Sequence, residues 1–346
     1  MPAAPLRVGI LNDMAASPAA PLNIEHWLRV AADELIGNGR LDRDVEFVYG
    51  CGLGLPSGTA AAVERAYASL AGQDVLLVIG PAIGDNALAA TPCAELHAIP
   101  TINWAGSERA RSQYMFHLQV GSHEDESILL AQYLHASGYK RVAVAYDRSP
   151  IGRRHFQFLQ LEAEILGLTI AAALPLPPMA ETADATPLLE ARPDAVLYLG
   201  LGVAAPAIAR ALSAANYTGP RAMNTAGIRG YAPDFAQAIE GWVYVDMHAD
   251  GNHTLAALRQ AHKIPPSGAL AAAKGYDLGR LMAEGLARAS EHTRVGVRKG
   301  LEQIKFLPAA EGHEGTLLGF GHYDRGALHG RYLVLRQWWN GESIER

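Results

Sequence analysis

The sequence repeats one order of elements: an apolar strand, a helix, a second strand and a second helix. The first copy begins near Val8 and the second near Val142. Strands that alternate with helices of about 10–15 residues are typical of a parallel sheet with helices on both faces. Ligands of such sheets bind beyond the carboxyl ends of the strands. The duplication therefore predicts two doubly wound α/β lobes, with a ligand cleft between them.

The length of the chain, 346 residues, also favours two domains, because a single hydrophobic core rarely grows that large. Helices are expected at 253–263, 270–290 and 294–306, which is more than the second repeat needs to cover its own sheet. We therefore expect the chain to return to the first lobe there. The predicted lobes are 1–120 plus 251–322 and 121–247 plus 328–346, with hinge crossings near 120–122, 247–251 and 322–331. The last two strands, 316–320 and 331–338, are expected to pair around the turn at 324–326.

Composition excludes several classes of protein. Charged residues make up only 18% of the chain, against about 25% in a typical globular domain, which favours elements buried on both faces. The net charge is −6 with both signs mixed, so a nucleic-acid partner is not expected. No run of 18 uncharged apolar residues occurs, so the sequence predicts no insertion into a membrane.

The cellular compartment stays open at this point. The opening MPAAPLRVGIL has neither a basic segment nor a separate apolar segment of a signal peptide. Cys51 and Cys93 are not marked as a pair, and unpaired cysteines are more common in a reducing compartment. We expect a cytoplasmic protein if Met1 is the native start, and a periplasmic one if a leader has been removed.

Motifs for catalysis and for cofactors are weak. Gly200-Leu201-Gly202 approaches a dinucleotide fingerprint, but 221–224 lacks the acidic residue that should follow. An NAD-type enzyme is therefore a minor alternative. The loop 50–58 lacks the lysine of a phosphate loop. The 13 histidines offer no helical pair with a third zinc ligand, and no G-x-S-x-G motif occurs. We expect no metal, no cofactor and no enzymatic activity.

Two loops at predicted strand ends suit a ligand better. The loop 80–86 ends a strand and opens a helix, so its backbone N–H groups can bind an anion or a dipole. The loop 103–107 follows the next strand and combines small residues with Trp104. A tryptophan there can form an apolar wall for a ligand; the alternative is that Trp104 belongs to the core.

An ordered set of segments resembles the leucine/isoleucine/valine-binding family of type I periplasmic binding proteins. The segments are VGILNDM, VLLVIGPAIGDNA, AIPTINWAGSERA, KRVAVAYDRSPIG and GYDLGRLMAEGL. This family supplies solute receptors to ABC importers and also includes cytoplasmic amide sensors. The resemblance implies two α/β lobes, a hinge of three strands and capture of a small molecule by closure. It also implies ABC transporter membrane subunits as partners, or a regulated protein if the chain is a cytoplasmic sensor.

The resemblance also implies a set of site residues. Amino-acid binders of this family hold the ligand carboxylate with residues matching Gly84 and 104–106. They hold the ammonium with an acid matching Thr225 and tyrosines matching Ile151 and Leu201. Here those three positions are neutral, so a ligand ammonium would lack its counter-charge, which costs several kcal/mol when buried.

We therefore expect a non-enzymatic binder of a small, fairly apolar molecule: an aromatic compound, an amide or a weak acid rather than a plain α-amino acid. Asp85 would disfavour a carboxylate unless its side chain points away, and Asp85 is the first candidate if an ammonium does bind. The expected ligand-binding residues are Gly84, Asp85, Asn86, Trp104, Ala105, Gly106, Ile151, Leu201, Thr225 and Tyr276.

Overall fold

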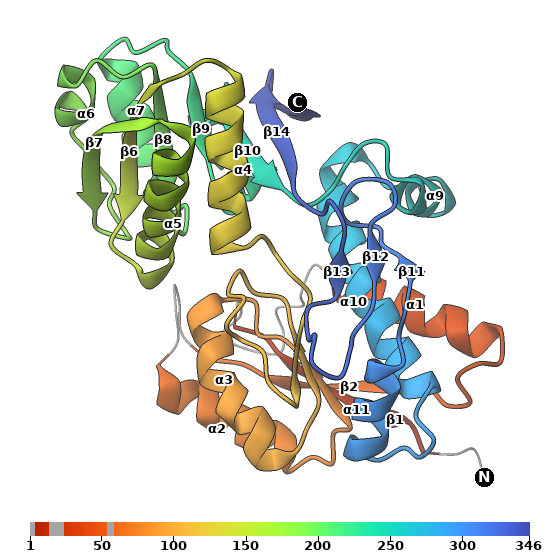
Figure 1. The fold of residues 1–346 in the computed structure, drawn as a ribbon. Coiled ribbons are helices and arrows are strands. Elements are labelled where there is room, and N and C mark those ends of the chain that lie inside the picture. Colours follow the sequence, from red (N-terminus) through yellow and green to blue (C-terminus); the bar gives the residue numbers. More distant parts are fainter. Residues whose placement is uncertain (1–3, 14–23, 54–58) are drawn as a thin grey trace. The chain divides into compact units, whose positions relative to one another are not determined.

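The computed structural model describes residues 4–13, 24–53 and 59–346. The chain divides into two compact units, which we call lobe 1 (Met1–Val120 with His248–Tyr332) and lobe 2 (Gly121–Met247 with Leu333–Arg346). The chain thus passes between the units three times. Each unit is an α/β structure built on a mainly parallel sheet, so the predicted fold class is confirmed (Figure 1).

Lobe 1 has a five-stranded parallel sheet in the order β2-β1-β3-β4-β5. Its strands are β1 (Leu6–Leu11), β2 (Val45–Gly50), β3 (Leu77–Ile79), β4 (Thr101–Asn103) and β5 (Met115–His117). Leu6, Val8 and Ile10 alternate along β1 and enter one core, whereas Leu11 enters the other, as the period of two in a strand requires. The first core is covered by α1 (Glu25–Gly37), α10 (Ala269–Ala287) and α11 (Arg294–Glu302), and the second by α2 (Ala60–Ala71) and α3 (Gly84–His97).

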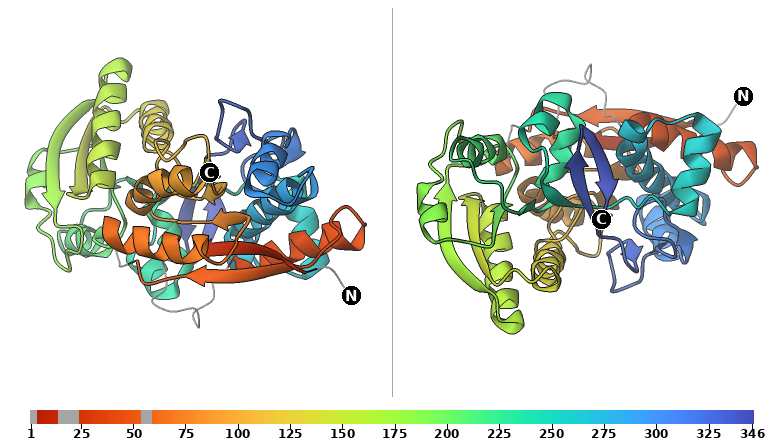
Figure 2. Two further views of the ribbon diagram at one scale, coloured as in Figure 1. Left: turned by 90° about the horizontal axis from the view of Figure 1, so that it is seen from below. Right: turned by 90° about the horizontal axis from the view of Figure 1, so that it is seen from above.

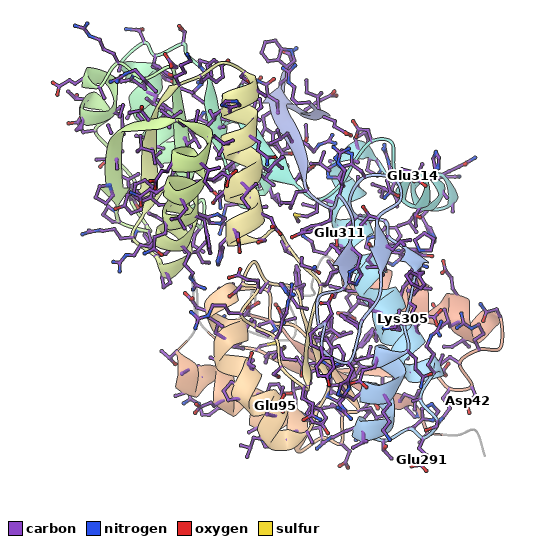
Figure 3. All side chains as sticks on the ribbon, viewed as in Figure 1. Asp42, Glu95, Glu291, Lys305, Glu311 and Glu314 are labelled. Carbon is purple, nitrogen blue, oxygen red and sulfur yellow. The ribbon has the colours of Figure 1, made fainter. Side chains whose placement is uncertain are left out.

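Smaller elements complete lobe 1. They are α9 (His253–His262), η2 (Pro266–Gly268) and a three-stranded antiparallel sheet of β11 (Leu307–Pro308), β12 (Leu317–Leu318) and β13 (Leu328–His329). The helix expected over 294–306 ends at Glu302, before β11. Glu95, labelled in Figure 3, accepts a hydrogen bond from the backbone N–H of Tyr114 at 2.7 Å. This contact ties the end of α3 to the turn that opens β5.

Lobe 2 has a seven-stranded sheet in the order β15-β14-β10-β9-β8-β6-β7. The parallel strands are β6 (Arg141–Asp147), β7 (Thr169–Leu176), β8 (Ala195–Leu199), β9 (Arg221–Met223) and β10 (Val243–Asp246). The strands β14 (Val334–Trp339) and β15 (Glu342–Glu345) extend this sheet in antiparallel fashion beyond β10 (Figure 2). One face carries α4 (His123–Ala136) and α5 (Pro150–Leu166); the other carries α6 (Thr186–Glu190), α7 (Ala205–Ala214), η1 (Thr225–Tyr231) and α8 (Pro233–Ala238).

The predicted pairing of the last two strands is wrong. The strand β12 pairs with β11 and β13 in lobe 1, whereas β14 pairs with β10 and β15 in lobe 2. Arg325 explains the difference, because its guanidinium is buried 4.4 Å from the centre of the Phe116 ring and donates to Glu302 at 2.7 Å. These contacts hold the turn in lobe 1, so 328–332 belong to lobe 1 and not, as predicted, to lobe 2.

Candidate functional site

The strand-end edge of lobe 1 contains a buried carboxyl group, Asp13, directly after β1. Its oxygens accept hydrogen bonds from the backbone N–H groups of Ala82 (3.1 Å) and Ile83 (2.8 Å) and from the side chain of Asn86 (3.0 Å). Burial raises the pKa of Asp13, although these donors oppose the shift. The expectation that the whole loop 80–86 offers its amides to a ligand is therefore wrong for 82–83. The backbone N–H groups from Gly84 onward, in the first turn of α3, remain predicted donors to a ligand.

Trp104 follows β4 at the same edge. Its backbone N–H donates to the carbonyl of Pro81 at 3.2 Å, and its half-buried ring packs against the core under α1 and α10. The N–H of the next residue, Ala105, donates to the side chain of Asn103 at 3.3 Å, so this amide has a partner within the protein. Trp104 is thus held by the core on one side and keeps accessible surface on the other.

Lys274 on α10 is a residue that the sequence analysis missed. Its side chain is only 5% exposed, and its Nζ lies 5.9 Å from the centre of the Trp104 ring. Tyr276, a predicted ligand residue, donates its hydroxyl to Glu34 on α1 at 2.8 Å. Two residues along a helix differ by about 200° in direction, which explains why Lys274 rather than Tyr276 lies beside Trp104. The sequence signal that could have identified Lys274 is that it is a lysine within the alanine-rich segment that opens α10.

In lobe 2 the strand β6 ends at Asp147, which is fully buried. Its Oδ2 accepts hydrogen bonds from the N–H of Leu201 (2.6 Å) and the hydroxyl of Tyr198 (3.1 Å). Its Oδ1 accepts from the N–H of Ser149 (3.2 Å) and from that residue's hydroxyl. Asp147 therefore fastens the loops after β6 and β8 to each other, and it is not presented to a ligand ammonium.

This carboxylate and Arg229 explain the two glycines of the dinucleotide-like motif. A Cβ on Gly200, at φ +154°, would come closer than 3.0 Å to the Asp147 carboxylate. A Cβ on Gly202, at φ +91°, would lie 2.7 Å from Cδ of Arg229. The glycines are thus required by close approach of the protein's own side chains, which removes the reason to infer a nucleotide phosphate there.

The residue Glu126 lies next to Thr225, the position where the sequence analysis found no acid. Its Oε2 accepts from the N–H of Thr225 at 2.7 Å, and its Oε1 accepts from the N–H of Ser122 at 3.0 Å. Ser122 in turn caps α4 by accepting from the N–H of Asp125 at 3.1 Å. Burial raises the pKa of Glu126 to about 8, so this carboxyl group is largely protonated at neutral pH.

Two histidines near the same edge are also uncharged. The rings of His123 and His155 meet edge to face with their centres 4.8 Å apart. Burial lowers the pKa of His123 to about 3 and that of His155 well below its usual value. Asn224 bridges His155 (3.1 Å) to the carbonyl of Gly200 (3.0 Å), which fixes the ends of β8 and β9 against α5.

The three predicted ligand residues of lobe 2 lie at the ends of three neighbouring strands. Ile151, Leu201 and Thr225 follow β6, β8 and β9, and each is partly exposed. Arg229, which the sequence analysis did not single out, lies beside them, and its Nε donates to the carbonyl of Leu201 at 2.7 Å. The edge therefore combines aliphatic surface with exposed cations, Arg229 and, directly after β6, Arg148. Within the described parts of the chain, no group of side chains suits a metal ion and no helix could span a bilayer.

The comparisons with known proteins agree with this architecture. The family model described as "Periplasmic binding protein" matches residues 5–331. The chain therefore belongs to the periplasmic binding protein family, in its type I fold. No curated protein sequence matches the chain.

Solved structures of the same fold cover nearly the whole chain. A type 1 periplasmic binding protein from Bordetella pertussis Tohama I has a TM-score of 0.83 at 16% identity, with 99% of this chain and 100% of that chain covered. An ABC transporter substrate-binding protein from Desulfitobacterium hafniense, in complex with Leu, has a TM-score of 0.78 at 17% identity (99% and 100% covered). A leucine binding protein from Thermotoga maritima has a TM-score of 0.76 at 15% identity (99% and 97% covered). The family and these structures are substrate-binding receptors rather than enzymes.

Proposed function

We propose that this protein is the periplasmic solute-binding component of an ABC importer. Its lobes would close on a small molecule, and the closed form would dock on the membrane subunits of the transporter. Membership of the family supports the general role. The burial of Asp147 and Glu126 at the ligand edge of lobe 2 supports a more specific statement, that the solute is not a plain α-amino acid.

The observation that carries this statement is how the carboxyl groups near that edge are used. Asp147 is surrounded by four donor groups of the protein, and Glu126 by two backbone N–H groups. Neither is accessible, since both are buried. A ligand ammonium placed against Ile151 and Leu201 would lose its water without gaining a counter-charge, which costs several kcal/mol.

The proposed ligand has a polar end and an apolar body. The first-turn amides of α3 at Gly84, Asp85 and Asn86, together with Gly106, would bind the polar end. Trp104, Ile151 and Leu201 would contact the body, since a mostly apolar surface with a few polar groups is typical of small-molecule sites.

A pair of compounds with the same hydrocarbon body tests the proposal. L-Leucine and 4-methylpentanoate differ only in the ammonium group, and binding of each is measured by thermal shift and by isothermal titration calorimetry. We expect 4-methylpentanoate to bind the more tightly. A ligand at 100 times its Kd stabilises the folded protein by about 2.7 kcal/mol, a readily measured shift. Micromolar binding of L-leucine would contradict the proposal, and Asp85 would then be the first candidate for the counter-charge.

Cell fractionation tests the compartment. We expect the protein, expressed from its native gene, in the periplasmic fraction together with activity for solute uptake. Recovery in the cytoplasm with a bound regulatory protein would instead support the sensor alternative.

A further inference from the structure

We infer that Arg229 is the residue by which lobe 2 binds the polar end of the solute, and that this polar end is a carboxylate on an apolar body. This inference rests on the proposed function and selects the weak acid from the aromatic, amide and acid classes. It assigns a ligand role to a residue that neither the sequence motifs nor the comparisons mark.

The position of Arg229 is the first support. It lies on η1, directly after β9, and its Nε–H donates to the carbonyl of Leu201 at 2.7 Å. Its Cδ passes over Gly202, where any Cβ would clash. The guanidinium is therefore oriented by its inner nitrogen, while its two outer nitrogens make no hydrogen bond to the residues that the structure describes. An oriented guanidinium loses less side-chain entropy when it binds an anion.

The absence of a partner is the second support. Arg229 is exposed, and among the residues that the structure describes it has no ion pair and no hydrogen bond other than the one to Leu201. Partial burial desolvates the guanidinium and lowers the pKa of Arg229 below its usual value, yet an arginine stays charged. The nearby carboxylate, Asp147, is already saturated by four donors.

On this face of the sheet a helix N-terminus adds to the positive potential, whereas Asp147 beside Leu201 and Asp234 on α8 oppose it. The first turn of α7, which follows Leu201 and Gly202, contains no acidic residue and has no side-chain cap. Its N-terminus carries the partial positive charge of the helix dipole. The acids of α4, Glu124 and Asp125, belong to the helix layer on the opposite face. A carboxylate near Leu201 would thus meet Arg229 and a helix N-terminus.

The chemistry distinguishes an acid from its amide. A guanidinium binds a carboxylate through two parallel N–H···O bonds, and such charge-assisted bonds are about twice as strong as neutral ones. A primary amide of the same shape has one acceptor oxygen and no charge. Losing one charge-assisted contact of about 1.5–3 kcal/mol corresponds to roughly a 10- to 100-fold loss of affinity.

The experiment uses acid and amide pairs with the full chain. The pairs are benzoate and benzamide, phenylacetate and phenylacetamide, and 4-methylpentanoate and 4-methylpentanamide. Their Kd values are measured by calorimetry for the wild type, Arg229→Gln and Arg229→Lys. Arg210→Gln is the matched control, since Arg210 is another exposed arginine of lobe 2, bonded to the carbonyl of Glu181.

We expect at least one acid to bind the wild type 10- to 100-fold more tightly than its amide. Arg229→Gln should weaken only the acid, Arg229→Lys should lie between, and Arg210→Gln should match the wild type. Amides that bind as well as the acids, acids that bind Arg229→Gln unchanged, or no binding of any acid would each overturn the inference. Tight binding of the amides alone would leave the proposed solute binder intact, whereas tight binding of L-leucine would remove the proposed ligand class itself.

Discussion

Replacing Glu126 by glutamine should change how the stability of lobe 2 depends on pH. Burial raises the pKa of Glu126 from 4.5 to about 8 in the folded protein, more than the hydrogen bonds from Thr225 and Ser122 lower it. In the unfolded chain the group ionises near its ordinary value. Between these two values the folded state holds more protons than the unfolded state, so the free energy of unfolding falls as pH rises. Each pH unit between the two pKa values changes the free energy of unfolding by about 1.4 kcal/mol, so the whole interval contributes at most about 5 kcal/mol.

Urea unfolding at pH 5, 6, 7 and 8 measures this contribution. The difference in stability, wild type minus Glu126→Gln, should decrease by up to about 4 kcal/mol over that range. Glutamine has one oxygen, so one of the two backbone N–H groups loses its acceptor, which costs about 1–3 kcal/mol at every pH. The change of the stability difference with pH therefore reports the ionisation of Glu126, whereas the constant part of the difference does not.

Two further groups define the controls. His123, whose pKa burial lowers to about 3, costs stability as pH falls below 6.5, because only the unfolded chain then takes up its proton. This effect is common to both proteins and cancels in the difference. Glu124→Gln removes an exposed carboxyl from the same helical turn and should follow the wild type. Parallel curves for wild type and Glu126→Gln would refute the reasoning, because Glu126 would then be a buried charge beside Thr225.

Three other substitutions give direct tests. Trp104→Ala should weaken ligand binding by about 2 kcal/mol or more in calorimetry; a loss of about 3–5 kcal/mol of stability with unchanged affinity would instead mark Trp104 as core. Gly200→Ala should lower the thermal midpoint of lobe 2 markedly, because its Cβ would overlap the Asp147 carboxylate, whereas Gly251→Ala, with open space around it, should not. Asp13→Asn should cost about 1–3 kcal/mol in urea unfolding, since an amide nitrogen cannot accept the N–H groups that Asp13 now accepts; an unchanged midpoint would show those bonds to be dispensable.

The fold was predictable because its signals are local. The strand and helix periods around Val8 and Val142 depend on neighbouring residues, and so does the cap of α4 at Ser122. Parallel strands also require crossover helices, which fixes the lobe class once the alternation is recognised. The ends of the strands, and hence the loops that hold site residues, follow from the same pattern.

The chemistry of the site was less predictable, because it depends on contacts between distant residues. Glu126 and Thr225 are 99 positions apart, and Asp13 and Ile83 are 70 apart. Nothing near Thr225 in the sequence indicates a carboxyl group beside it. Nothing near Gly80 indicates that the N–H groups of this loop donate to Asp13. Whether Lys274 or Tyr276 lies beside Trp104 depends on how α10 is rotated about its own axis, and a motif match does not give this rotation.

The prediction that the two terminal strands pair was wrong for a related reason. A turn between two apolar runs predicts a hairpin, but whether the runs pair depends on which sheet has an edge available. The edge of β10 in lobe 2 takes β14, and β12 is left with β11 and β13. That competition involves Val243–Asp246, nearly a hundred residues earlier in the chain.

The return of the chain to each lobe has a consequence for its biosynthesis. Lobe 1 lacks α10 and α11, which cover one face of its sheet, until the segment His248–Tyr332 has been made. At about 5–20 residues per second this takes roughly 10–40 s after Val120 emerges. The sheet of lobe 2 is complete only when Leu333–Arg346 has been made and β14 joins β10, roughly 5–20 s after Met247. The core of lobe 1 under α10 and α11 therefore stays open on the ribosome until most of the chain has been made, and the sheet of lobe 2 lacks β14 and β15 until the end, so neither lobe can fold completely before translation is nearly finished.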